Sequence, residues 1–199
     1  MKRFFALVAT LVVSLSMTAQ STVVESPATD ALYRIPMDKG VSVIAKALTP
    51  VNWGVAMHLN QVEFCAWEFS ASKKSDVFAP REGVVESAGE GEVLILHPDG
   101  LYTSLQAMDG VVVKAGDKVE KGDKVGMAGH LSNGTWRVWM AVYHLKNNPN
   151  YGTPARNGNY EHLMQYVDPI FATKGKCKEM LIDGGAYTVK ARTWCWPWE

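Results

Sequence analysis

The sequence predicts an all-β protein, a small antiparallel barrel-sandwich with a C-terminal hairpin appendage. Short segments rich in β-branched and aromatic residues recur along the chain, turn residues separate them, and almost no segment shows a helical period. The predicted strands are 41–45, 83–87, 92–96, 101–105, 110–113 and 137–144, and strand-like spacing also covers 54–69.

Glycine-containing turns join these strands. Pro98-Asp99-Gly100 predicts a tight hairpin turn, since glycine accepts the positive φ that such turns require. Val113 to Gly126 contains the pattern Gly-Asp-x-Val twice, which predicts two tight turns with valines buried between them, as at the corner of a small barrel. Asp183-Gly184-Gly185 predicts the turn of a hairpin over 179–193.

The N-terminal segment predicts export. Lys2 and Arg3 precede an apolar run over 4–15, and small and polar residues follow, which is the order of a secretory signal peptide. The run is too short to span a bilayer. We therefore expect a protein of the periplasm or the extracellular space. The predicted parts are a signal peptide (1–20), a leader and first strand (21–44), the main domain (45–173), and a C-terminal hairpin with a tryptophan-rich tail (174–199).

The charge of the chain restricts the choice of partner. Twenty basic and twenty acidic residues cancel, and no long block of one sign interrupts the sequence. This balance argues against nucleic acid or an anionic membrane surface as the main partner. A glycan, a peptide or another protein is left open.

After export, the three cysteines would be in an oxidising compartment, where disulfides can form. Cys177 and Cys195 flank the predicted hairpin, but pairing about its turn leaves them three residues out of register. A disulfide there would need a bulge or an end that curls back. We interpret Cys65 as a buried free thiol.

Two blocks of sequence carry a family resemblance. Phe78-Ala79-Pro80 with Gly83 and Val85 comes first, and the Gly-Asp-x-Val repeat follows. The repeat alone also occurs in biotinyl and lipoyl carrier domains, but no lysine here sits on an exposed tight hairpin. With the first block, residues 63–171 resemble the lysostaphin-like (LytM-type) zinc endopeptidases, which cut peptide cross-bridges of bacterial cell walls. The resemblance implies their fold, which contains a duplicated hybrid motif.

The same resemblance implies that the zinc ligands and catalytic histidines are missing. Matching the blocks places Phe64 and Glu68 at the first His and Asp ligands, Ala107 at a catalytic histidine, and Arg137 and Trp139 at the final His-x-His. A hydrolytic zinc site needs about three protein ligands and an open position for water. Only Glu68 retains a donor, and the guanidinium of Arg137 would repel a cation. We therefore predict no zinc or other cofactor, no catalytic residue and no metal ligand.

Other residues offer no replacement site. The five histidines are His58, His97, His130, His144 and His162, and no pair has a spacing that places two rings on one face. We interpret them as surface or capping residues. The prediction is thus a non-catalytic protein that binds peptidoglycan or regulates a cell-wall hydrolase. The alternative is a divergent zinc metalloendopeptidase that cleaves peptidoglycan cross-bridges.

Two interpretations of the former cleft are open. In one, Phe64 and Trp139 fill the space and Glu68 pairs with Arg137. In the other, an aromatic-lined groove still holds a glycan or peptide. The long loop over 147–161 is expected to join Trp139 in binding, because long loops are often functional. For the tail around Trp194, Trp196 and Trp198, packing on the domain and an exposed recognition patch are the two possibilities.

Overall fold

The computed structural model describes residues 31–48, 66–145, 164–174 and 178–190. The predicted signal peptide, Phe64, all three cysteines, the loop over 147–161 and the tryptophan-rich tail lie outside these ranges. Within them, strands are the only long regular elements, which confirms the all-β fold class. The part of the chain that the structure describes contains no helix that could span a membrane.

The strands are short, as the turn-rich sequence predicts. Their bounds are β1 Leu32–Arg34, β2 Ser42–Leu48, β3 Ala66–Ala71, β4 Asp76–Phe78, β5 Gly83–Gly89, β6 Glu92–Leu96, β7 Tyr102–Gln106, β8 Met108–Val111, β9 Lys118–Val119, β10 Lys124–His130, β11 Trp136–Leu145, β12 Met164–Tyr166, β13 Ile170–Ala172 and β14 Gly185–Thr188.

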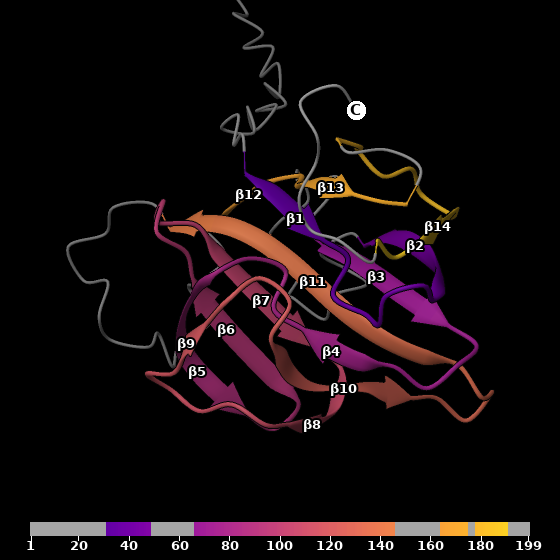
Figure 1. Cartoon of the computed structure of the whole chain (residues 1–199), viewed down its shortest axis with the longest axis horizontal. Coiled ribbons are helices and arrows are strands. Elements are labelled where there is room, and N and C mark those ends of the chain that lie inside the picture. The colour runs from indigo at the N-terminus through magenta and orange to yellow at the C-terminus, as the bar shows by residue number, and fades with distance from the viewer. Residues whose placement is uncertain (1–30, 49–65, 146–163, 175–177, 191–199) are drawn as a thin grey trace, which may run out of the picture.

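The long strand β11 lies in the middle of the main sheet (Figure 1). The strand order is β14-β2-β3-β11-β7-β6-β5-β9, and all of these pairs are antiparallel. β10 also pairs with β11, β4 and β8, and β12 pairs with β11. The exception is the parallel pair of β1 and β13, which joins the start of the described chain to the end of the main domain. β1 lies ahead of the first strand that the sequence predicted.

The Gly-Asp-x-Val repeat forms two tight turns, as predicted. Gly116 and Gly122 have φ of 88° and 99°, a region that favours glycine. In each turn the aspartate that follows accepts a hydrogen bond from a backbone N–H three residues earlier, Asp117 from Lys114 at 3.0 Å and Asp123 from Glu120 at 2.8 Å. The repeat therefore supplies both the backbone freedom and the side-chain acceptor at each corner.

The C-terminal segment turns where the sequence predicts, but its arms have other partners. Gly184 has φ of 74°, and the Gly185 N–H closes the turn on the Ile182 carbonyl at 2.9 Å. Glu179, however, bridges Phe171, and β14 pairs with β2 at the edge of the main sheet. The described part of the predicted hairpin is thus joined through β14 to the main sheet and through Glu179 to β13, rather than closed on itself.

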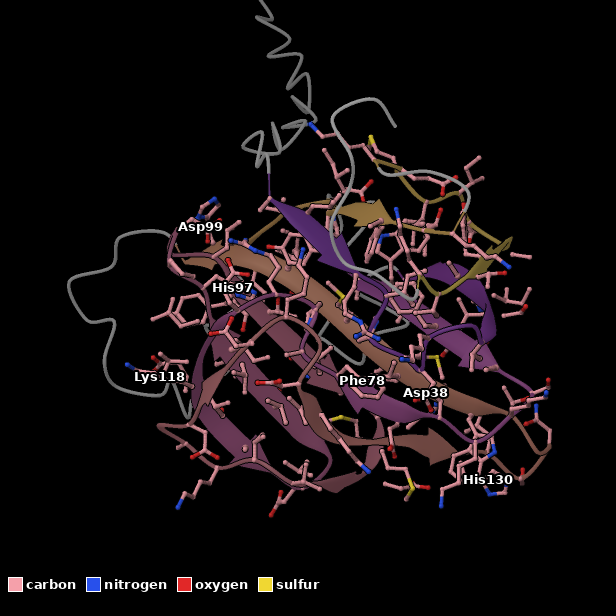
Figure 2. All side chains as sticks on the ribbon, viewed as in Figure 1. Asp38, Phe78, His97, Asp99, Lys118 and His130 are labelled. Atoms are coloured by element: carbon pink, nitrogen blue, oxygen red, sulfur yellow. The ribbon has the colours of Figure 1, made fainter. Side chains whose placement is uncertain are left out.

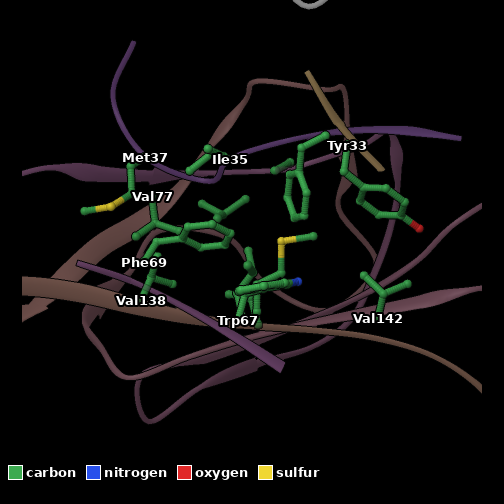
Figure 3. Packing of buried hydrophobic residues seen from close by; sticks show 14 of the residues in the cluster. Tyr33, Ile35, Met37, Trp67, Phe69, Val77, Val138 and Val142 are labelled. Carbon is green, nitrogen blue, oxygen red and sulfur yellow. The ribbon is translucent and has the colours of Figure 1, made fainter. Parts of the chain in front are cut away.

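The core lies between the main sheet and the strands packed against it (Figure 3). Residues far apart in the sequence meet there: Tyr33 and Ile35 near the start, Phe69 and Val138 from adjacent strands, and Phe171 near the end, all fully buried. The ring of Phe171 contacts those of Phe69 and Tyr33, at centroid distances of 5.6 Å and 6.4 Å. These contacts fix β1 and β13 onto the domain.

A buried arginine links three parts of this core. The side chain of Arg81 is 8% exposed, and its Nη1 donates to the hydroxyl of Tyr33 at 3.0 Å and to the carboxylate of Asp99 at 2.9 Å. Its guanidinium also lies over the Tyr33 ring, 5.1 Å from the centroid. Burial raises the pKa of Tyr33 to about 12, so the hydroxyl is neutral at physiological pH. Arg81 therefore ties β1 to the turn between β6 and β7.

His97 lies in the same region and is buried rather than at the surface, which corrects our interpretation of it as a surface or capping residue (Figure 2). Its Nδ1 lies 2.7 Å from the Glu82 carbonyl oxygen, which can only accept, so Nδ1 carries the proton. Nε2 of the neutral ring then accepts from the hydroxyl of Thr103, also at 2.7 Å. The side-chain contacts thus satisfy one neutral tautomer.

We expect the free energy of unfolding to decrease as the pH falls, because of His97. Burial lowers the pKa of His97 below its ordinary value of about 6.5. Below that pH the unfolded chain binds a proton that the folded chain does not, and stability falls by at most about 1.4 kcal/mol per pH unit. Urea unfolding at pH 7.5 and pH 5.5 measures this. His97→Gln should be less stable at pH 7.5 and should lose part of the pH dependence. An identical dependence in the variant would contradict the prediction.

Candidate functional site

The predicted site residues on β3 and β11 lie side by side. The two strands are antiparallel neighbours, with Trp139 opposite Glu68 and Arg137 opposite Ser70. Because side chains alternate between the faces of a strand, all four project from the same face of the sheet. That face is opposite the one on which Phe69 and Val138 enter the core.

Glu68 is the centre of a three-residue cluster. Its Oε2 lies 3.4 Å from Nη1 of Arg137 and accepts a hydrogen bond from the indole Nε1 of Trp139 at 2.7 Å. The guanidinium of Arg137 lies over the Trp139 ring, 4.8 Å from the centroid. The expected pairing of Glu68 with Arg137 is therefore confirmed. The Glu68 and Arg137 side chains are 18% and 29% exposed, so the pair is accessible from solvent.

Ala107 lies at the turn that follows β7. The preceding residue, Gln106 on β7, is opposite Trp139 on β11. Ala107 therefore follows directly after a residue that neighbours the cluster. Ala107 has φ of 60°, and its carbonyl accepts a hydrogen bond from the Gly129 N–H at 3.0 Å. A methyl side chain at this turn offers neither a ligand nor a proton carrier.

The described residues around Glu68 do not form a metal site. Nowhere in the described ranges do three His, Cys, Asp or Glu side chains lie together as ligands. His97 is held in the core, and the ring of His130 lies against that of Trp136 at 4.5 Å. Figure 2 places these two histidines at opposite ends of the domain. Zinc would also need three protein ligands where the cluster has one carboxylate, already bonded to a cation and an indole.

Aromatic side chains continue along the same face toward the other end of β11. The rings of Tyr102 and Tyr143 are stacked at 5.9 Å with an interplanar angle of 11°, and Tyr166 meets Tyr143 edge-on at 6.0 Å. Trp139 packs against this group. Burial raises the pKa of Tyr102, which keeps its hydroxyl neutral. Tyr143 and Tyr166 are buried, so the aromatic surface that this face offers to a ligand comes from Tyr102 and Trp139, which are half-buried.

Polar residues that the sequence did not single out lie next to the cluster. Gln106 donates to the carboxylate of Glu92 at 2.8 Å, and the Ser104 hydroxyl donates to the same oxygen at 3.0 Å. Strand alternation on β7 would have grouped Ser104 with Gln106. Nothing in the sequence sets the register that brings Glu92 to them.

Replacing Glu68 with glutamine is expected to lower the free energy of unfolding by about 1 kcal/mol. The variant removes the charge opposite Arg137 but retains a carbonyl oxygen for the indole of Trp139. The loss stays below the several kcal/mol of a fully buried pair because both side chains reach solvent. Chemical denaturation measures it. Arg137→Gln should cost a similar amount, and the double variant less than the sum; additive losses would contradict an energetic coupling.

Comparison with known proteins identifies the fold. Residues 65–150 match the family model described as Peptidase family M23. The match spans a little under half of the chain. The matched range contains Glu68, Ala107, Arg137 and Trp139, so the cluster lies within the region that matches this family. No curated protein matches the chain.

Several solved structures are similar to this chain. Csd3 of Helicobacter pylori is 21% identical over 57% of this chain and 32% of its own, with a TM-score of 0.42. The chain thus spans about a third of Csd3. A structure of the SpoIIQ-SpoIIIAH pore-forming complex is 21% identical over 58% and 85%, with a TM-score of 0.43. The deep-sea M23 metalloprotease pseudoalterin is 14% identical over 82% and 98%, with a TM-score of 0.46.

Proposed function

We propose that this protein is an exported, non-catalytic member of its family that binds peptidoglycan through the sheet face around Trp139. The observation that carries the proposal is the cluster of Glu68, Arg137 and Trp139. A carboxylate in contact with a guanidinium and an indole is a poor zinc ligand, because a cation would have to displace both partners.

The same face suits the retention of a cell-wall fragment. Trp139 and Tyr102, which are half-buried, provide aromatic surfaces, and the half-buried Gln106 provides an amide group beside them. Flat rings with a few polar groups are typical of sites for sugars and peptides. Export, which the N-terminal segment predicts, would bring this face to the cell wall. The loop over 147–161, expected to contribute, lies outside the described residues.

Purified protein tests the absence of hydrolysis. We expect far less than one zinc per chain by elemental analysis, and no release of soluble fragments from purified peptidoglycan. One zinc per chain, together with lysis that a chelator abolishes, would instead establish the divergent zinc endopeptidase.

Co-sedimentation with insoluble peptidoglycan tests binding. We expect the parent protein to sediment with the cell wall and Trp139→Ala to lose most of this retention, because the substitution removes the central aromatic surface. Lys118→Ala, an exposed change on β9 at the far edge of the sheet, is the control and should bind like the parent. Equal retention of both variants would overturn the proposed face. Lack of retention of the parent would favour a protein partner, such as a cell-wall hydrolase.

A further inference from the structure

A groove adjoins the cluster on the same face of the sheet. Its volume is about 360 Å³, near the lower end of the usual range for ligand sites. It crosses from β14 over β2 and β3 to the start of β11, lined by Ser42, Val43, Ile44, Ser70, Ala71, Ser72, Thr135 and Ala186. The cluster at Glu68 begins where this groove ends, because Ser70 is opposite Arg137.

The lining of the groove is neutral. Four hydroxyl side chains, from Ser42, Ser70, Ser72 and Thr135, alternate with aliphatic groups, and Ile44 in the middle is 46% exposed. Hydroxyls can both donate to carbonyl groups and accept from amide N–H groups. The groove is also small, at about 360 Å³. Such a lining suits a peptide backbone with small side chains better than a large or charged side chain.

Positive charge lies at the cluster end of this groove. Lys46 is opposite Glu68 on β2, and Arg137 contacts Glu68 from β11, so two cations flank one carboxylate. In the described part of the chain, Arg137 donates a hydrogen bond only through Nη1, at 3.4 Å. A guanidinium has five N–H donors, and stacking on Trp139 holds its plane in place. The remaining donors can therefore receive an anion.

We propose that the groove binds the carboxyl-terminal end of a short peptide with small side chains, with its carboxylate at Arg137. The backbone of the peptide would run along the hydroxyl-lined groove, and its terminal carboxylate would supply the negative charge that one of the two cations lacks. A hydrogen bond between two charged groups is about twice as strong as a neutral one. This inference rests on the proposed function, because it names the ligand chemistry of the same face.

Two probes distinguish recognition of a terminal carboxylate from binding of a peptide backbone without it. The probes are acetyl-trialanine with a free carboxyl group and the same peptide with a carboxyl-terminal amide. They differ in the negative charge that Arg137 would contact. Calorimetric titration of the whole protein should give about tenfold tighter binding of the acid than of the amide, the ratio that about 1.4 kcal/mol produces. Equal affinities, or no binding of the acid at millimolar concentration, would overturn the proposal.

Three variants locate the ligand. Arg137→Gln should remove the preference for the acid while binding of the amide is retained. Ser42→Tyr, which places an aromatic ring over the exposed rim of the groove, should weaken the binding of both probes. Lys118→Gln removes a distant exposed cation and should bind like the parent. An undiminished preference in Arg137→Gln, or equal losses in Lys118→Gln, would exclude carboxylate recognition by Arg137.

The outcome is separable from that of the proposed function. If the protein sediments with peptidoglycan but does not distinguish the acid from the amide, the inference about Arg137 fails and the proposed binding role stands. If the acid binds in the groove but the protein does not sediment with the cell wall, the peptidoglycan proposal fails and the ligand chemistry stands.

Discussion

Replacing Arg81 with methionine is expected to lower the free energy of unfolding by about 3 kcal/mol. The variant leaves the hydroxyl of Tyr33, which is fully buried, without the guanidinium at 3.0 Å, and it removes the cation from the face of the same ring. The expected loss is at the low end for a broken buried pair because the Asp99 side chain is 39% exposed and can be solvated. Thermal denaturation should show a decrease of about 10 °C in Tm.

Matched variants distinguish the linking role of Arg81 from a general effect of charge. Lys118→Met makes the same change at an exposed position and should alter the stability by less than about 0.5 kcal/mol. Tyr33→Phe removes one hydroxyl and should cost about 1 kcal/mol. If Arg81→Met and Lys118→Met have the same Tm, the contacts of Arg81 do not stabilise the fold, and β1 is held by its ladder with β13 and by apolar packing.

Arg81 also illustrates why part of the fold was not predictable. Turn chemistry is local, so the turns at Gly100, Gly116 and Gly122 could be predicted from sequence and are present. β1 could not be predicted, because its three residues gain their place from a parallel ladder with β13 at the other end of the domain. The partners of Arg81 likewise come from two separate segments. A single sequence contains no signal for such pairings.

The candidate site divides in the same way. Alternation on two strands was enough to place Glu68, Arg137 and Trp139 on one face, and the structure adds that they are in contact. The groove beside them was not predicted. It depends on β14 pairing with β2, which replaces the self-paired hairpin that the Gly184-Gly185 turn had indicated. The sequence predicts the turn, but it does not predict that the following strand, β14, pairs with β2 at the edge of the main sheet.

Gly129→Ala is expected to destabilise the protein by about 3 kcal/mol, at the upper end for overpacking of a core. Gly129 lies on β10 against the turn that carries Ala107, and a Cβ there would be 2.3 Å from the Ala107 carbonyl oxygen and 3.2 Å from its carbonyl carbon. Both are backbone atoms, so no side-chain rotation relieves the clash. β10 would have to move away, with loss of the hydrogen bond from the Gly129 N–H to the same oxygen.

Gly110→Ala is the matched control, since a Cβ at Gly110 would have no neighbour within 4 Å. Neither glycine has a φ in the left-handed region, so alanine is compatible with both backbones and the two variants differ in the space around the new methyl group. The damage should also reach the site, because Ala107 follows Gln106, which is opposite Trp139. We therefore expect Gly129→Ala to lose both thermal stability and retention on peptidoglycan, while Gly110→Ala keeps both. Equal melting temperatures for the two variants would show that the backbone around Ala107 accommodates the methyl group without loss, and the expected steric clash at Gly129 would be wrong.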